Sequence, residues 1–186
     1  ATLNANAFDG GIGVKYYLSD EWAARGGLQF ASANQNVPHP SPPGTDGSIS
    51  AWSVGVSGSL EYHLTKTRVS PYLGGGVGFS LARTESKSIA DPGADQTTTK
   101  NFFGGVTIGG QPYLSGTRLS VFGLAGVEYF FVKEVSLAAE YRLGFASTSR
   151  PDQEVIVGNT TTTTPIGSTT VLAIATGGVL TLAVYF

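Results

Sequence analysis

The chain has 186 residues, a formal net charge of −2 and only 13% charged residues, about half the share usual in a soluble domain. This charge leaves no basic face to neutralise phosphates, which argues against nucleic acid as a partner. Cysteine is absent, which excludes a disulfide framework and a thiolate metal site.

Seven segments alternate between large apolar side chains and small or polar ones. Because successive side chains of a strand point to opposite faces, this period of two predicts β-strands. The fifth segment is less regular, since Phe122 and Leu124 share the parity of the polar residues. In chain order the predicted strands are 12–18, 22–30, 51–62, 69–81, 118–131, 135–146 and 168–186.

The last segment is uncharged over nineteen residues and is long enough to cross a bilayer as a helix. Its Gly177-Gly178 pair and its many Thr and Val residues oppose a helix. Six companion segments of the same pattern favour a strand here as well.

The connections alternate between short and long. The short ones are 19–21, 63–68 and 132–134, and the long ones are 33–48, 82–117 and 147–167. Transmembrane barrels have short turns at one end and long loops at the other. Within the second long loop, 102–116 is more apolar than a free loop should be, which suggests a short hairpin extending the wall or a segment folded back over the mouth.

Strand length and aromatic placement favour a membrane barrel over a soluble barrel or sandwich. The alternation runs for roughly ten residues or more, near the ~9–11 that cross a bilayer at a tilt. Outward aromatic residues gather in two bands, as membrane interfaces favour. The band at the short turns holds Tyr16, Trp22, Tyr62, Tyr129, Phe131 and Phe186, and the band toward the long loops holds Phe30, Trp52, Phe79 and Phe145.

Six charged residues lie on the parity of the glycines and serines and are therefore expected to face the barrel interior. They are Lys15, Arg25, Glu61, Glu128, Glu140 and Arg142. One interpretation is a narrow ion-conducting pore gated by these charges. The other is a salt-bridge network that fills the interior, and the narrow lumen of a small barrel favours it, since buried charges must be paired.

No residue pattern indicates catalysis, a cofactor or a metal. His39 lies in a proline-rich loop and His63 at a short turn, so the topology predicts them at opposite ends. His39 with Asp46 is the one candidate pair, and a solvated loop histidine is the simpler interpretation. We therefore expect a protein that is not an enzyme.

Seven strands conflict with the even number found in bacterial single-chain barrels. We expect a first strand upstream of Ala1, with 1–7 as a remnant of the loop behind it. The whole of 1–186 is then one barrel domain of about eight strands.

With these residues in view, the chain resembles the small outer-membrane β-barrel proteins of the porin-like superfamily of Gram-negative bacteria. The resemblance is carried by GGIGVKYYLSDEWAARGGLQF, VSPYLGGGVGF, GVEYFFVKEVSLAAEYRLGF and the terminal LAVYF. It implies an all-β transmembrane antiparallel up-and-down barrel in the outer membrane, with the bilayer and lipopolysaccharide as surroundings. It also implies that Leu182, Val184 and Phe186 form the signal read by the barrel-assembly machinery.

The leading functional hypothesis is a non-enzymatic barrel, structural or adhesive, that binds partners through its long loops. The alternatives are a narrow transport pore, a lipid-modifying enzyme and an accessory subunit of a larger membrane complex.

Overall fold

The computed structural model describes residues 12–41, 43–65, 67–102, 104–108, 111–133 and 135–165, together with the backbone of 171–184. These residues form strands, turns and loops. Among them there is no helix long and apolar enough to cross a membrane.

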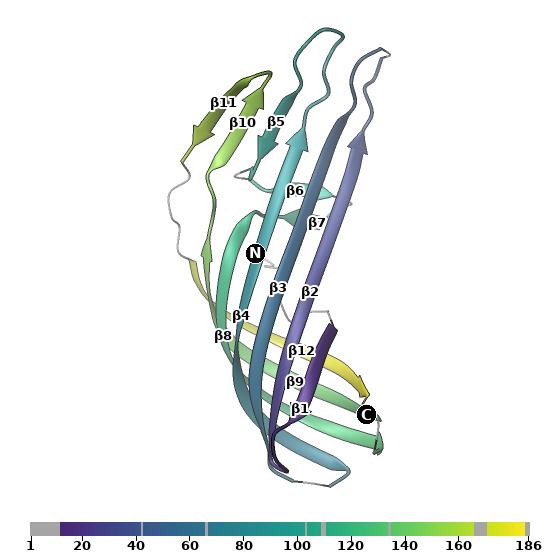
Figure 1. The fold of residues 1–186 in the computed structure, drawn as a ribbon, viewed down its shortest axis with the longest axis vertical. Helices are drawn as coiled ribbons and strands as arrows, with labels where there is room; N and C mark the ends of the chain where they lie inside the picture. Colours follow the sequence, from purple (N-terminus) through teal and green to yellow (C-terminus); the bar gives the residue numbers. More distant parts are fainter. Residues whose placement is uncertain are drawn as a thin grey trace.

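Seven strands, called here the wall strands, are paired antiparallel in the order β1-β2-β3-β4-β8-β9-β12 and curl around an interior (Figure 1). This confirms the predicted all-β antiparallel architecture. Their bounds are β1 Ile12–Tyr17, β2 Trp22–Val37, β3 Gly47–His63, β4 Val69–Lys87, β8 Gly116–Val132, β9 Val135–Ser149 and β12 Val171–Val184.

The two outermost wall strands, β1 and β12, run in the same direction. β1 ends beside β2 at Ala23, and β12 ends beside β9 at Val135, so both run toward the short turns. They are not paired with each other among the described residues. A further strand that paired antiparallel with both β1 and β12 would run in the opposite direction to them. The residues 1–7, predicted as the remnant of a loop, lie outside the described residues.

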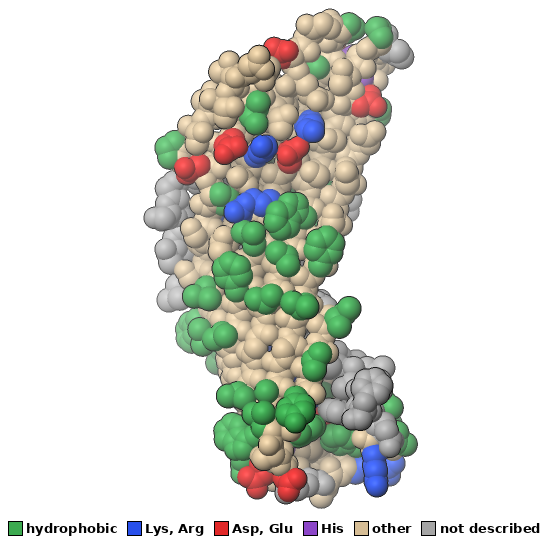
Figure 2. Space-filling view, in the orientation of Figure 1, with side chains coloured by type: hydrophobic (Ala, Val, Ile, Leu, Met, Phe, Trp, Pro, Cys, Tyr) green, Lys and Arg blue, Asp and Glu red, His purple; other side chains and the backbone are tan. Residues whose placement is uncertain are grey.

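The outward parity of the wall strands β2, β3, β4, β8 and β9 carries a band of exposed apolar side chains, called here the apolar band (Figure 2). On β3 it begins at Tyr62 and ends at Trp52, beyond which the outward residues are Ser50 and Ser48. On β4 it ends at Leu81, beyond which charged residues follow. The band covers 22–30, 52–62, 69–81, 119–131 and 135–145.

The segments 33–48, 82–117 and 147–167, predicted as long loops, consist in large part of strands. Beyond the apolar band, β2 and β3 remain paired up to Val37 and Gly47, and β4 continues to Lys87. The upper part of β4 pairs with β5 (Thr97–Lys100), which is followed laterally by β10 (Gln153–Val157) and β11 (Thr160–Thr164). We call the upper parts of β2, β3 and β4 with β5, β10 and β11 the distal sheet.

On the upper parts of β2, β3 and β4 the outward positions are Ser, Asn or charged residues, so the outward apolar alternation ends there. Backbone pairing between neighbouring strands still satisfies the peptide groups there, and threonine suits a strand well. The tips of the distal sheet are also braced: Thr45 forms a β-bridge with Ala90, and Gln96 Nε2 donates to the carbonyls of Asp46 and Ser88 at 2.8 Å each.

The apolar part of the second long connection forms a separate hairpin of β6 (Val106–Ile108) and β7 (Gln111–Tyr113). Val106 and Ile108 are buried against Ala51 on the inward parity of β3. Of the two sequence interpretations, the structure therefore has the segment folded back over the interior. The base of this hairpin is held by Ser115 Oγ, which lies 2.9 Å from the backbone N of Thr84 and 2.8 Å from its Oγ1.

Inward glycines make room for large side chains inside the wall. A Cβ on Gly126 would lie 2.5 Å from the Tyr72 ring, and one on Gly76 would lie 2.5 Å from the Phe122 ring. Tyr72, Phe122 and Leu124 are buried and pack together. Phe122 and Leu124 break the inward polar pattern because they fill space that the glycines leave open.

Candidate functional site

A network of charges, the charge network, crosses the interior between strands on opposite sides of the curl. It consists of Lys15, Arg25, Glu61, Glu128, Glu140 and Arg142, and the structure brings all six together. β1 supplies Lys15, β2 Arg25, β3 Glu61, β8 Glu128, and β9 both Glu140 and Arg142.

Glu61 is the centre of the charge network. Its side chain is fully buried, and its two carboxylate oxygens lie 2.9 Å from Lys15 Nζ and 2.6 Å from Arg25 Nη2. Strand periodicity places it on the inner face, and the register Glu61↔Ala23 places it two residues from Arg25 on the neighbouring strand. One carboxylate thus joins the charges of β1 and β2.

The two other carboxylates extend the charge network to the far wall. Lys15 Nζ lies 2.7 Å from Glu128 Oε2, and Arg25 Nη1 lies 2.8 Å from Glu140 Oε2. Arg142 Nε donates to the second oxygen of Glu140. The result is a continuous chain of alternating charges from β8, through β1, β3 and β2, to β9.

Four side chains that sequence reasoning did not select complete the charge network. Tyr72 Oη donates to Glu140 Oε2 at 2.9 Å, Tyr17 Oη donates to Glu128 Oε2 at 3.2 Å, and Ser136 Oγ donates to Glu128 Oε1. His63 Nε2 lies 3.7 Å from Glu61, and its ring stacks on Tyr72 with centroids 5.1 Å apart. All four lie on the inward parity of their strands, and continuing that parity one step past Glu61 would have identified His63.

The charge network pairs three carboxylates with three basic side chains. Each carboxylate has at least two charged or hydroxyl partners, which offsets the cost of removing it from water. The arrangement is that of a cross-brace through a narrow interior. Among the described residues no group of three or more His, Cys, Asp or Glu could hold a metal ion.

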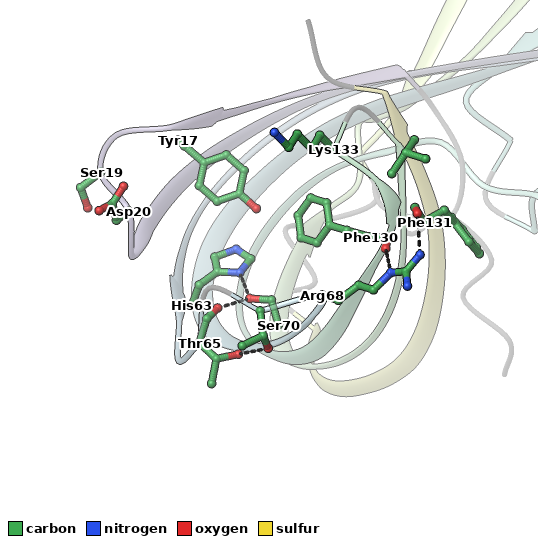
Figure 3. A pocket seen from close by; sticks show the side chains of 12 residues that line it. Tyr17, Ser19, Asp20, His63, Thr65, Arg68, Ser70, Phe130, Phe131 and Lys133 are labelled. Atoms are coloured by element: carbon green, nitrogen blue, oxygen red, sulfur yellow. Dashed lines mark hydrogen bonds between the residues drawn. The ribbon is translucent and has the colours of Figure 1, made fainter.

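A cavity of about 580 Å³ opens below the charge network at the short-turn end (Figure 3). His63 Nδ1 lies 2.8 Å from Ser70 Oγ, which donates to the carbonyl of Thr65 at 2.7 Å. Arg68 donates to the carbonyls of Phe130 and Phe131 at 3.1 and 3.0 Å. These polar groups serve the turns themselves, so the cavity is the mouth of the curled sheet and not a site arranged around a ligand.

The comparison with protein families matches residues 2–164 to the outer membrane protein beta-barrel domain. The chain belongs to this family. It is therefore a protein of the bacterial outer membrane, and the curled antiparallel sheet is its membrane-spanning wall. No curated protein and no solved structure matches the chain in the two other comparisons.

The family fixes the orientation of the outer-membrane barrel, because short turns of such barrels face the periplasm and long connections face the exterior. The apolar band then faces lipid, and the distal sheet stands outside the cell. The charge network lies inside the membrane-spanning part, and the cavity of Figure 3 is the periplasmic mouth.

The interface aromatics that the structure describes lie exposed on the outward parity. At the periplasmic end the Trp22 and Tyr62 rings lie 5.1 Å apart, as do those of Tyr129 and Phe131. Tyr62 Oη donates to Glu21 at the turn, at 3.5 Å, so its polar tip points toward water. The described set is Tyr16, Trp22, Tyr62, Tyr129 and Phe131 at this end, and Phe30, Trp52, Phe79 and Phe145 toward the exterior.

Two other predicted groups are placed as follows. Leu182 and Val184 of the predicted assembly signal lie in β12, where only the backbone is described, and Phe186 lies outside the described residues. His39 was expected to be a solvated loop histidine, but its side chain is largely covered and its Nε2 lies 3.3 Å from Asp91 Oδ1. Its backbone N–H donates to Asp46 at 2.9 Å, so the residue braces two tips of the distal sheet.

Proposed function

We propose that this outer-membrane barrel is a non-enzymatic, non-conducting protein whose distal sheet is a contact surface for partners outside the cell. The observation that carries the proposal is the distal sheet itself. Three wall strands continue past the apolar band as paired, polar strands, and three further strands are added beside them.

The contacts that hold the distal sheet in one conformation support a binding role. Lys100 lies opposite Glu85 and Glu154 on its two neighbouring strands, and the tips are joined by the Thr45–Ala90 bridge. A surface held in one conformation loses little entropy when it binds, which favours affinity. Binding residues are often carried on such elements at the end of a rigid scaffold.

The interior supports a non-conducting barrel. The charge network spans the membrane interior from wall to wall, and the β6–β7 hairpin covers the inner face nearer the exterior. An ion crossing the lumen would have to displace paired charges in a space that an eight-stranded barrel fills with side chains.

Conductance in a planar bilayer tests this point. We expect the purified protein to give no steady openings. Openings in the wild type that change when Glu140 is replaced by Gln would instead support the alternative of a narrow pore, because Glu140 carries charge and pairs with Arg25 and Arg142.

An accessory subunit of a larger membrane complex would need a docking surface, and the apolar segment 102–116 is one candidate. Val106 and Ile108 of this segment are occupied in an internal contact, so the distal sheet is the better docking surface. Purification in mild detergent followed by mass spectrometry of co-eluting chains tests for such a complex. Unchanged lipid A after deletion of the protein would dismiss lipid-modifying activity.

A further inference from the structure

Among the described residues, the outer edge of the distal sheet is a strand with no partner on its outer side. β11 consists of five consecutive threonines, Thr160–Thr164, all exposed, and it pairs only with β10 among the described residues (Figure 1). Natural edge strands are usually blunted by a lysine, a proline, a bulge or a covering segment. β11 has no charge, no proline and no irregularity in its register with β10.

The hairpin geometry tells which backbone groups of β11 are available. Val157 and Thr160 close a two-residue turn that includes Gly158 at φ 55°. In such a hairpin the closing pair exchanges hydrogen bonds, and alternate residues then point their backbone groups away. The N–H and C=O groups of Thr161 and Thr163 therefore point outward from the sheet.

We propose that β11 pairs antiparallel with β11 of a second copy of this protein, held in a facing membrane. Centred on Thr162, two such strands place Thr161 of each opposite Thr163 of the other, with their outward backbone groups matched. Every threonine of one strand then lies opposite a threonine of the other, and cross-strand threonine pairs are favourable. The segment is thus complementary to itself without any charge.

The direction of β11 selects the facing membrane. β4 runs away from the lipid, β5 runs back, β10 runs away again, and β11 runs toward the lipid. Two copies in one membrane would therefore present their β11 strands in the same direction. Antiparallel pairing, the more stable arrangement per residue, is open to a copy whose barrel points the opposite way.

Each contact of this kind is short and weak by itself. Many copies on two apposed membranes would add their contacts, since the first pairing holds the remaining copies within reach. This inference rests on the proposed function and makes it specific: the contact surface is an edge strand, and the partner is the same protein on a neighbouring cell or vesicle.

Vesicle clustering tests the inference. The full chain is inserted into phosphatidylcholine vesicles labelled with donor or acceptor dye, and energy transfer between the two populations reports clustering. We expect wild-type vesicles to cluster with one another and not with protein-free vesicles. Dispersed wild-type vesicles, or equal clustering with protein-free vesicles, would overturn the proposal.

A charge exchange at the edge makes the test specific. Thr161→Lys with Thr163→Lys should abolish clustering of like vesicles, and so should the corresponding double Glu variant, because like charges would then lie opposite each other. Mixed Lys and Glu vesicles should cluster again, at least as strongly as wild type. Lys vesicles that cluster among themselves like wild type, or a mixture that stays dispersed, would contradict β11 pairing.

A matched control places the same charge elsewhere on the distal sheet. Ser48→Lys with Ser50→Lys lies on β3, away from the β11 edge, and should leave clustering unchanged. Heat-sensitive gel mobility verifies that every variant is folded. Failure of clustering would leave the proposed function standing if the barrel is silent in bilayers, because the distal sheet could still bind a different partner.

Discussion

Replacing Glu61 by Gln tests whether the charge network holds the outer-membrane barrel together. The substitution keeps the shape of the side chain and removes its charge, so the charge network changes from three acids and three bases to two acids and three bases. Glu61 is fully buried and pairs with Lys15 at 2.9 Å and Arg25 at 2.6 Å. Removing one partner of a buried pair costs about 3–5 kcal/mol.

The geometry places the expected loss at the lower end of that range. Lys15 retains Glu128 at 2.7 Å, and Arg25 retains Glu140 at 2.8 Å, so neither cation is left alone. We expect the free energy of unfolding to fall by about 3 kcal/mol. The matched control is Glu85→Gln on the distal sheet. Glu85 pairs with Lys87 at 3.4 Å, and both side chains are substantially exposed. This control should lower the free energy of unfolding by about 0–1 kcal/mol.

The measurement is urea unfolding in phospholipid vesicles, followed by the fluorescence of Trp22 and Trp52. Both tryptophans lie exposed on the outward face, so unfolding removes them from lipid. If the two variants lower the free energy of unfolding by amounts within 1 kcal/mol of each other, on the order of the accuracy of such measurements, the interpretation of the charge network as a brace is refuted.

Three further substitutions test other parts of the fold. Gly126→Ala should lower the free energy of unfolding by about 1–3 kcal/mol, because the new Cβ would lie 2.5 Å from the Tyr72 ring, whereas Gly26→Ala meets nothing within 4 Å and should be nearly neutral in the same assay. Val77→Arg in the middle of the apolar band should cost about 2–4 kcal/mol by urea unfolding, and Ser50→Arg beyond the band should cost less than about 1; equal costs would show that Val77 does not face lipid. Ser115→Ala removes both contacts to Thr84, so hydrogen exchange at 106–108 should accelerate while the wall strands stay protected. Unchanged exchange in that hairpin would mean that Val106 and Ile108 hold it without the hydroxyl.

Local periodicity predicted the wall because a membrane strand must show lipid one kind of side chain along its whole length. Trp52, Val54 and Val56 on one parity, with Glu61 on the other, carry that signal without any knowledge of neighbours. Family membership and the all-strand structure confirm the class of fold and its location. The signal ends beyond Trp52 and Leu81, where the outward residues of β3 and β4 are Ser50, Arg83 and Glu85. For this reason the sequence pattern predicts loops where the structure has the distal sheet.

The sequence by itself determined the parity of each wall strand, and hence which six charges would share the interior. The parity of a residue tells which face of the sheet its side chain occupies, but not its height in the barrel or the side chain that it contacts. Only the tertiary structure decided that Lys15 meets Glu61 and Glu128, and that Arg25 meets Glu61 and Glu140, because those contacts depend on register and on the curl of the sheet. It also decided that five threonines form the outer edge of a sheet, since their pairing partner β10 is reached through a tight turn and joins β5 from a distant part of the chain.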